Sequence, residues 1–304
     1  MYKYKFTVFT PTYNRENTLA RCYESLLSQT FKDFEWLIVD DGSTDNTESL
    51  VKKFADGAKF PIRYCKQRNS GKHIAVNKGA ELANGEFFCD LDSDDMLVPD
   101  GLKILYDSYC SIPDQLKSDF GVVLGLVCDF EGNIICREFP KDIIDGNYID
   151  IGFEYKIEGD KGFFIKTDIL KQYPFPAFGN EKFLAESIVW NKIVLKYKTR
   201  CVNRIITKKE YRKNGLSSNS IKNRVLNPIG ALNNYREILN MPAAKPLVFM
   251  IRNSINYCRF VLHARQAGKI FTDLDKKNRF ITILCFPIGI IYYLGDKLMI
   301  AKQK

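Results

Sequence analysis

The chain has 304 residues, of which 45% are hydrophobic and 27% charged, a composition that is ordinary for a globular protein and excludes wholesale disorder. Its 11 Pro and 19 Gly exclude collagen-like and low-complexity classes. The nine Cys are scattered without a CxxC pair, which favours buried thiols in a reducing compartment over a zinc ribbon or a disulfide framework.

The net charge of +9 is divided unevenly along the chain. Residues 1–190 contain 22 Lys/Arg and 31 Asp/Glu, whereas residues 191–304 contain 23 Lys/Arg and 5 Asp/Glu. This asymmetry predicts two functional regions: an acidic one that suits a cation, and a basic one that suits an anionic partner such as a membrane surface. A well-solvated basic surface is the plainer alternative. The basic region has no recurrent basic–aromatic spacing, so we expect no nucleic-acid partner.

Over the first hundred residues, strands alternate with amphipathic helices. Apolar runs predict strands at 5–10, 34–39, 62–65 and 86–91, and 3.6-residue periodicity predicts helices at 16–29, from Asp45 onward, and at 72–83. Asp45 is expected to cap its helix together with Glu48, and Pro99 to lie in the first turn of the next one. Short connections between alternating strands and helices predict an α/β fold with a mostly parallel sheet flanked by helices.

The later chain predicts strands at 120–128 and 161–165 and a helix at 183–196; from about residue 220 it is helical and basic. One apolar stripe is expected in the basic part, with Arg259 and His263 among the polar positions around it; its members are Leu247, Ile251, Ile255, Cys258 and Leu262. The N-terminus lacks a signal-peptide pattern. No run reaches the ~20 apolar residues of a membrane span. The nearest, 280–294, is expected either to lie in a membrane interface or to form a buried helix broken at Pro287.

Three polar loops, 11–15, 40–43 and 92–95, each follow a predicted strand. Because ligands bind beyond the carboxyl ends of strands in such sheets, we expect these loops to converge on one crevice. In the run from Asp92 to Asp95, crowded carboxylates suit Mg²⁺ or Mn²⁺ bridging to a diphosphate, or alternatively cap the next helix. Neither GxGxxG nor GxxxxGK[ST] occurs, so dinucleotide and P-loop sites have no support.

Three further groups suit ligand chemistry, each with a plainer alternative. Asp40 and Asp41 are acceptors for a base or a ribose hydroxyl, or else belong to an Asp-Gly turn. Lys72 opens a helix whose N-terminus suits a phosphate, or else faces solvent. Glu181 and Glu186 lie around the start of the helix expected at 183–196, where a carboxylate acts as a general base or merely complements the helix dipole.

Five segments together resemble the family-2 inverting glycosyltransferases of the non-processive bacterial type. They are TPTYNR (10–15), SLLSQTF (25–31), LIVDDGSTDNT (37–47), NSGKHIAVNKGAELANGEF (69–87) and LDSDDMLVPDGL (91–102). The resemblance is close over about 5–105 and looser to about 215. It implies a GT-A nucleotide-binding fold at 1–218, with a nucleotide-sugar half at 1–105 and an acceptor half at 106–218, followed by a helical basic region at 219–304.

The resemblance also implies roles for individual residues. It assigns Asp92, Asp94 and Asp95 to a Mn²⁺ or Mg²⁺ ion, and makes Glu186 the catalytic base with Glu181 in reserve. The nucleotide sugar is expected to contact Thr10, Pro11, Tyr13, Arg15, Asp40, Asp41, Lys72, His73, Asp92 and Ser93. Tyr211-Arg212 and Gly215-Leu216-Ser217 resemble a loop that closes over the donor or acceptor.

These parts imply metal-dependent transfer of one sugar, most commonly from a uridine diphosphate donor, with inversion by single displacement. The implied acceptor is a hydroxyl of a glycan or lipid-linked molecule. The implied location of the protein is the cytoplasm or the cytoplasmic face of a membrane, where the basic region would contact anionic lipid. The chain has no QxxRW segment, which argues against a polymerase. One alternative is a sugar-1-phosphate nucleotidyltransferase, which the single Arg15 in the first loop disfavours. Another is a non-catalytic protein that binds nucleotides or a membrane surface.

Overall fold

A computed structural model describes residues 2–210, 219–270 and 272–301, and the chain forms two compact units. The first unit contains Met1–Phe175 and Val189–Tyr211, and the second contains Pro176–Ile188 and Arg212–Lys304. The expected division after residue 218 does not anticipate that Pro176–Ile188 packs with the C-terminal helices. The loop expected at Tyr211-Arg212 and Gly215-Leu216-Ser217 lies outside the described residues.

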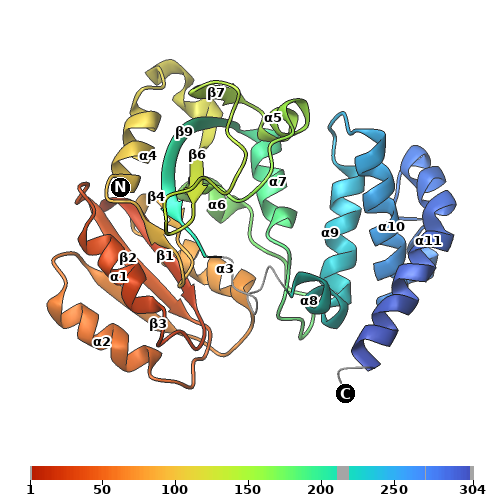
Figure 1. The fold of residues 1–304 in the computed structure, drawn as a ribbon, viewed down its shortest axis with the longest axis horizontal. Helices are drawn as coiled ribbons and strands as arrows, with labels where there is room; N and C mark the ends of the chain where they lie inside the picture. The colour runs from red at the N-terminus through yellow and green to blue at the C-terminus, as the bar shows by residue number, and fades with distance from the viewer. Residues whose placement is uncertain (1, 211–218, 271, 302–304) are drawn as a thin grey trace. The chain divides into compact units, whose positions relative to one another are not determined.

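In the first unit, nine strands form one sheet in the order β3-β2-β1-β4-β8-β6-β9-β5, with β7 paired to β9 (Figure 1). The strands are β1 (Tyr4–Thr12), β2 (Phe34–Asp40), β3 (Ile62–Lys66), β4 (Gly85–Asp90), β5 (Met96–Leu97), β6 (Phe120–Cys128), β7 (Ile143–Gly146), β8 (Gly162–Lys166) and β9 (Lys198–Lys208). The first four strands are parallel, as expected. Because β8 runs antiparallel to both β4 and β6, the sheet as a whole is mixed.

Helices connect the strands of this unit. They are α1 (Leu19–Leu27), α2 (Thr47–Gly57), α3 (Lys72–Leu82), α4 (Gly101–Cys110), α5 (Tyr148–Tyr155), α6 (Thr167–Gln172) and α7 (Ser187–Lys196), with a 3₁₀ turn η1 (Asp114–Asp119). The expected cap of α2 is wrong, because Asn46 holds the N-cap position and Glu48 pairs instead with Lys52 and Lys66. Pro99 also lies outside its helix, since Asp100 is the N-cap of α4.

The first core joins both halves of the sheet. Phe6 and Val8 of β1 are fully buried beside Trp36 of β2. The rings of Phe87 in β4 and Phe164 in β8 lie 4.4 Å apart, centre to centre. These strands therefore bury apolar side chains across the junction between the parallel and antiparallel parts, which gives their carboxyl ends a well-packed support.

The second unit is helical. Its helices are α8 (Ser220–Leu226), α9 (Pro228–Asn240), α10 (Leu247–His263) and α11 (Lys276–Ala301), with a 3₁₀ turn η2 (Ala267–Ile270). Tyr235 of α9 stacks on Phe260 of α10 with ring centres 5.5 Å apart. Helices α10 and α11 pack closely, because a Cβ atom at Gly289 would lie 2.4 Å from that of Cys258. A separate core thus supports this unit.

The structure of the basic region differs from the expectation at two places. The expected apolar stripe of α10 is only partly buried, since Leu247 at one end is 62% exposed whereas Cys258 is completely buried. Arg259, expected among polar positions, is buried and pairs with Asp296 of α11, which also lies 2.8 Å from Nε2 of His263. Helix α11 continues through Pro287 and is long and apolar enough to cross a membrane by length and composition, although most of its apolar window is exposed.

Candidate functional site

The loops after the parallel strands meet, as expected, at one edge of the sheet. The hydroxyl of Ser43 accepts a hydrogen bond from the N–H of Asn14 at 2.8 Å, and Thr47 Oγ1 accepts one from the N–H of Arg15 at 2.9 Å. The chain leaves β1 toward β2 but later returns to β4 on the other side of β1. The carboxyl ends of β1 and β4 therefore flank a topological switch point, where open α/β sheets bind ligands.

Asp41 ties the loop after β2 to the start of α3. Its Oδ1 accepts hydrogen bonds from Nε2 of Gln67 and the N–H of Ser70, both at 2.8 Å. Its Oδ2 accepts one from the N–H of Gly71 at 2.7 Å. Gly71 has φ +96°, a conformation that favours glycine. Each carboxylate oxygen accepts two hydrogen bonds, so one position on Oδ2 is left for a ligand N–H or O–H.

Asp40 is engaged inside the protein. It is fully buried, and its carboxylate accepts hydrogen bonds from the N–H of Ser43 and the hydroxyl of Tyr64. Burial, together with this carboxylate, raises the pKa of Tyr64 above its usual range. Because Asp40 is completely buried whereas Asp41 keeps 6% exposure, Asp41 is the one of the two adjacent acids that a ligand can reach.

Of the residues at the end of β1 that were expected to contact the ligand, some lie in the core and one lies at the surface. Thr10 is fully buried and accepts a hydrogen bond from Nε1 of Trp36, so its side chain serves the core. Pro11 is buried as well, whereas Tyr13 is 46% exposed. Thr12, which sequence reasoning missed, carries a buried hydroxyl with no hydrogen-bond partner among the described residues. It is therefore a further polar group at this edge.

Lys72 and His73, adjacent in sequence, have different environments. Nζ of Lys72 lies 2.6 Å from Asp92 and 3.9 Å from Asp90. His73 is buried, and burial lowers its pKa against the opposing effect of Asp41. Its Nδ1 has no partner among the described residues. His73 is therefore uncharged at neutral pH, and Lys72 is the cation of this pair.

The acidic loop after β4 surrounds a lysine that sequence reasoning missed. Nζ of Lys209, just after β9, lies 2.9 Å from Asp95, 3.8 Å from Asp92 and 3.7 Å from Asp160. Ser93 is buried within the same loop. Lys209 has no local signal in the sequence, since its partners lie far from it along the chain.

The lysines and carboxylates shift one another's pKa. Partial burial would raise the pKa of Asp92, but the positive charges of Lys72 and Lys209 outweigh it and lower this pKa to about 2. Burial raises the pKa of Asp95 to about 7, against the lowering effect of Lys209. Burial also disfavours charged Lys209, but the three carboxylates outweigh it and hold its pKa above the usual range. Lys209 thus stays positively charged at neutral pH.

The acidic loop fits a divalent cation that shares its coordination with a substrate. Within the described residues, no three acidic, His or Cys side chains are placed to hold a metal ion alone. Asp94, however, is half-exposed and has no ion pair there, and Asp92 lies beside it in the chain. Mg²⁺ and Mn²⁺ usually bind through one or two carboxylates together with phosphate oxygens. Asp95 is the least available of the three expected ligands, because its side chain is only 7% exposed and pairs with Lys209, whereas that of Asp92 is 34% exposed.

In the second unit, Glu181 caps a helix. Its Oε1 and Oε2 accept hydrogen bonds from the N–H groups of Ile229 and Gly230, at 2.8 and 2.6 Å, in the first turn of α9. Oδ1 of Asn227 in turn accepts from the N–H of Lys182, at 2.8 Å. The reciprocal bonds fix the segment before α7 to α9. Glu181 thus has a structural use that does not favour it as a base.

Glu186 directly precedes α7 and is half-buried. The hydroxyl of the next residue, Ser187, donates a hydrogen bond to Oδ1 of Asn234 at 3.0 Å. Glu186 therefore lies in a segment that is held on both sides, at Glu181 and at Ser187. Of the two expected acids, it is the one whose carboxylate does not cap α9.

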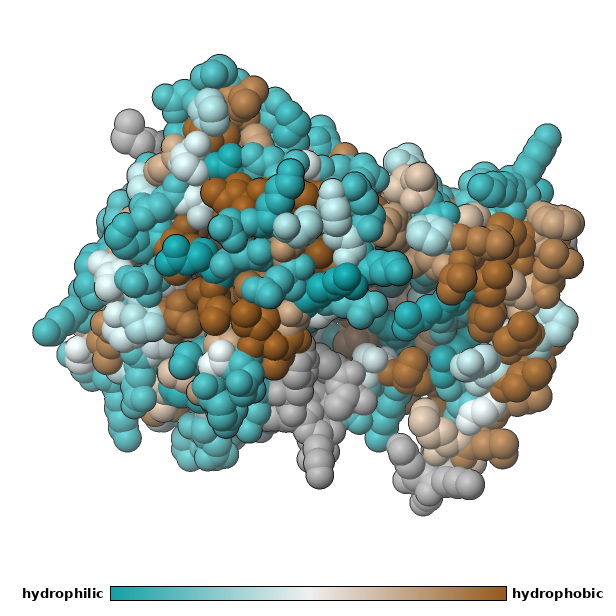
Figure 2. All heavy atoms as spheres, turned by 45° about the horizontal axis from the view of Figure 1, so that its top comes forward, coloured by the Kyte–Doolittle hydropathy of each residue, from teal (hydrophilic) through white to brown (hydrophobic). Residues whose placement is uncertain are grey.

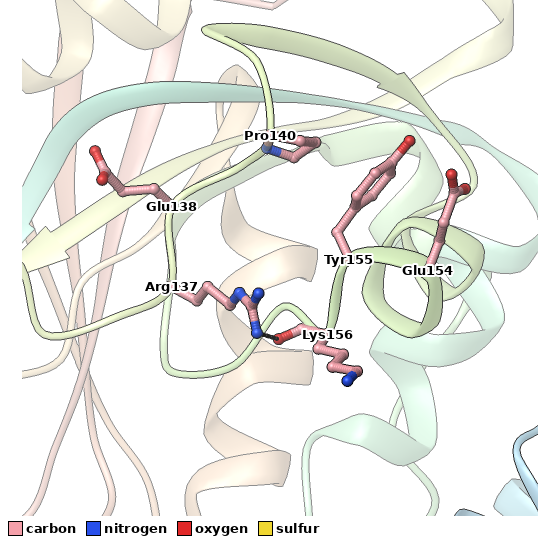
Figure 3. A pocket seen from close by; sticks show the side chains of 6 residues that line it. All are labelled: Arg137, Glu138, Pro140, Glu154, Tyr155 and Lys156. Carbon is pink, nitrogen blue, oxygen red and sulfur yellow. Dashed lines mark hydrogen bonds between the residues drawn. The ribbon is translucent and has the colours of Figure 1, made fainter.

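A separate pocket of about 270 Å³ lies in the first unit, away from the candidates named in the sequence (Figure 3). Tyr155 and Glu154, at the end of α5, face it from one side. Nη1 of Arg137 donates a hydrogen bond to the carbonyl of Lys156 at 3.4 Å. Its lining residues are Arg137, Glu138, Pro140, Glu154, Tyr155 and Lys156, a mixture of charges that favours neither an anion nor a cation.

Part of the chain matches a known family model. Residues 7–116 match the model described as Glycosyl transferase family 2. The glycosyltransferase GlyA of Streptococcus pneumoniae is 38% identical over 102 residues, which cover 34% of this chain and 14% of that protein. Chondroitin synthase of Escherichia coli is 33% identical over 152 residues, covering 50% and 19%. The match therefore spans less than a fifth of either relative.

Solved structures resemble the whole chain. Staphylococcus aureus TarS 1–349 in complex with UDP is 21% identical with a TM-score of 0.61, and the match covers 96% of this chain and 92% of that one. The mannosyltransferase PcManGT from Pyrobaculum calidifontis, in complex with GDP-Man and Mn²⁺, is 18% identical with a TM-score of 0.59, covering 98% and 89%. The likeness confirms the expected α/β architecture of GT-A type with a C-terminal helical region.

Proposed function

We propose that the protein transfers one sugar from a nucleoside diphosphate sugar to a hydroxyl group of a glycan or lipid-linked acceptor, because residues 7–116 match the model described as Glycosyl transferase family 2. The observation that carries the proposal is that this segment brings Asp41, Lys72 and the acidic loop after β4 together at the switch point of the sheet. The UDP and GDP-Man complexes of the two similar structures support a nucleotide sugar as donor. We favour uridine diphosphate.

The base and the diphosphate of the nucleotide sugar each have suitable partners among the described side chains. The remaining acceptor position of Asp41 suits an N–H of the base, and the exposed ring of Tyr13 offers a surface against which the base can stack. Lys72 and Arg15 supply positive charge next to Asp92, which suits the diphosphate. When bound, a Mn²⁺ or Mg²⁺ ion held by Asp94 and Asp92 would neutralise charge on the leaving diphosphate.

The transfer step needs a base and a nucleophile. Glu186 accepts the proton of the acceptor hydroxyl while that oxygen forms a bond to the anomeric carbon, from the face opposite the diphosphate. The bond from the anomeric carbon to the diphosphate oxygen breaks, and its electron pair leaves with the diphosphate. A single displacement inverts the configuration at the anomeric carbon and needs no covalent intermediate on the protein.

We also propose that α11 brings the protein to the cytoplasmic face of an anionic membrane. Its outer apolar side chains include Phe280, Leu284, Ile291 and Leu298, each more than 60% exposed. Figure 2 shows apolar side chains gathered over the C-terminal helices. The inner side carries Asp296, which pairs with α10, so the outer side has no acidic residue among the described positions. A helix with one apolar side in a basic region suits an interface of anionic lipids.

Vesicle flotation tests the membrane proposal. We expect the protein to float with phosphatidylglycerol vesicles at low salt, and Ile291→Asp to remain at the bottom of the gradient. Leu116→Asp is the matched control, because Leu116 is an exposed apolar residue of the first unit. Equal flotation of wild type and Ile291→Asp would contradict the proposal. Self-association through this face without any flotation would also contradict it.

The nine free cysteines agree with a reducing compartment.

A transfer assay tests the function itself. Release of nucleoside diphosphate is measured with a panel of nucleotide sugars and hydroxyl acceptors, for wild type and Glu186→Gln. We expect one donor to be used, and Glu186→Gln to bind the diphosphate normally but turn over on the order of 100-fold more slowly. Release of pyrophosphate from a nucleoside triphosphate and a sugar 1-phosphate would instead support a nucleotidyltransferase. Nucleotide binding without turnover of any donor would support a non-catalytic binding protein.

A further inference from the structure

Lys209 places a positive charge inside the acidic loop. Lys209 directly follows β9. The last residue of β9, Lys208, pairs with Met96 in β5, and Met96 is the residue that follows the acidic run 92–95. The backbone N–H of Lys209 donates a hydrogen bond to the carbonyl of Cys128 at 2.8 Å. Its side chain is only 19% exposed. Both its backbone and its ammonium group are therefore fixed, and Nζ lies where a cation would otherwise be drawn by the carboxylates.

The carboxylates around Lys209 come from two parts of the chain. Asp92 and Asp95 belong to the loop after β4, and Asp160 precedes β8. Of the three, Asp95 is the closest to Nζ, at 2.9 Å, and is buried. Asp94 belongs to the same loop but has no ion pair among the described residues. The lysine thus engages the inner carboxylates and leaves an outer one exposed.

The acidic and basic side chains at this edge do not cancel in charge. Five carboxylates lie here, those of Asp90, Asp92, Asp94, Asp95 and Asp160. Three cationic side chains oppose them, those of Lys72, Lys209 and Arg15. Among the described residues the carboxylates outnumber the cations, and this excess of negative charge suits a divalent cation.

We propose that Lys209 is a built-in cation that limits this site to a single divalent ion and directs that ion to Asp94 and the donor diphosphate. By holding Asp95 and Asp160, it prevents them from joining Asp92 in a cage that would bind a metal tightly without substrate. Lys209 is thus a positioning residue for metal binding. The inference rests on the proposed nucleotide-sugar function for the outer ion, but the effect of Lys209 on the inner carboxylates is independent of it.

The test is Mn²⁺ binding by the full chain, measured by electron paramagnetic resonance of free Mn²⁺ with and without UDP. Wild type is expected to bind one Mn²⁺ per chain with UDP and only weakly without it. Lys209→Met should bind Mn²⁺ at least about tenfold more tightly in the absence of UDP, because the inner carboxylates lose their counter-charge. Lys208→Met is the matched control, since Lys208 is the preceding residue but has no ion pair with the acidic loop among the described residues.

Two further variants separate the possible results. Lys209→Arg keeps the charge and should bind Mn²⁺ like wild type, and the double variant Lys209→Met/Asp95→Asn should lose the gain of the single one. Should Lys209→Met fail to fold, Lys209→Gln repeats the measurement with a polar side chain. Unchanged Mn²⁺ affinity in folded, uncharged variants at position 209 would overturn the inference. If Lys209→Met gains Mn²⁺ affinity without UDP but the protein binds no nucleotide, the inference about Lys209 is supported and the proposed function is contradicted.

Discussion

Nζ of Lys72 lies 2.6 Å from a carboxylate oxygen of Asp92, so the first residue of α3 is joined to the loop after β4. The contact crosses β1, because β3 and β4 lie on opposite sides of that strand in the sheet. Lys72 is only 24% exposed at its side chain, which limits screening by solvent. This ion pair therefore helps to define the edge at which we propose the donor diphosphate binds.

Replacing Lys72 by Met should weaken UDP binding about tenfold, because a charge-assisted contact to the diphosphate is lost. Lys78→Met is the control on the same helix, since Lys78 forms an i,i+3 pair with Glu81 on the surface. Titration calorimetry measures both affinities. Equal affinities for the two variants would show that Lys72 does not contact the nucleotide.

The segment before α7 offers a test of stability. Glu181→Gln should lower the free energy of unfolding by about 1–2 kcal/mol, because a charged cap at the N-terminus of α9 becomes neutral and one hydrogen bond is lost. Urea unfolding measures the change, with the exposed Glu24→Gln on α1 as control. If both substitutions have the same small effect, the reciprocal cap does not stabilise the second unit.

A glycine in α3 is required for close packing on the sheet. A Cβ atom at Gly79 would lie 2.3 Å from the ring of Phe9 in β1. Gly79→Ala should therefore destabilise the protein by about 1–3 kcal/mol, although alanine is the better helix former. Gly152→Ala in α5 is the matched control, because a Cβ there meets no atom within 4 Å and should be neutral or stabilising. Similar melting temperatures for the two variants would contradict the close packing.

The two histidines predict a loss of stability in acid. Burial lowers the pKa of His263, against the opposing effect of Asp296, and burial lowers that of His73 as well. The unfolded chain therefore binds more protons than the folded one as the pH falls through the unfolded pKa of about 6.5, and the free energy of unfolding falls with it. The contribution is fully present above that pKa.

Urea unfolding between pH 8 and pH 5 measures this dependence. His263→Gln should reduce the slope of unfolding free energy against pH, and His73→Gln should reduce it separately, since the two residues belong to different units. A slope that neither substitution changes would mean that other groups account for the acid sensitivity.

The parallel half of the sheet could be predicted from the sequence because its signals are local. Continuous apolar runs such as Phe34–Val39 form buried strands, and the turns between them bring the polar loops to one edge. The start of α1 was harder to predict. The helix expected from Glu16 begins instead at Leu19, and the N–H of Glu16 donates a hydrogen bond to the side chain of Asp45, a contact between residues 29 positions apart.

The parts of the candidate site that lie at strand ends could be predicted from the sequence. The parts that depend on ion pairs between residues far apart in the sequence could not. Asp92 and Asp95 stand shortly after a strand, but Lys209, which pairs with both, follows a strand more than a hundred residues later in the chain. The burial of Arg259, which was expected among polar positions, could not be predicted for the same reason, since its partner Asp296 lies on another helix. Charged residues that neutralise one another in the interior carry no periodic signal.

We propose that the edge formed by β1, β2 and β4 binds a nucleoside diphosphate with a divalent cation at Asp94. Titration calorimetry of UDP, with and without Mn²⁺, on wild type and Asp94→Ala tests it most directly. We expect Mn²⁺ to strengthen UDP binding to wild type by about tenfold or more, and Asp94→Ala to remove this gain while the protein remains folded. Equal Mn²⁺-dependent binding by both proteins, or no binding of UDP or any other nucleoside diphosphate, would contradict it.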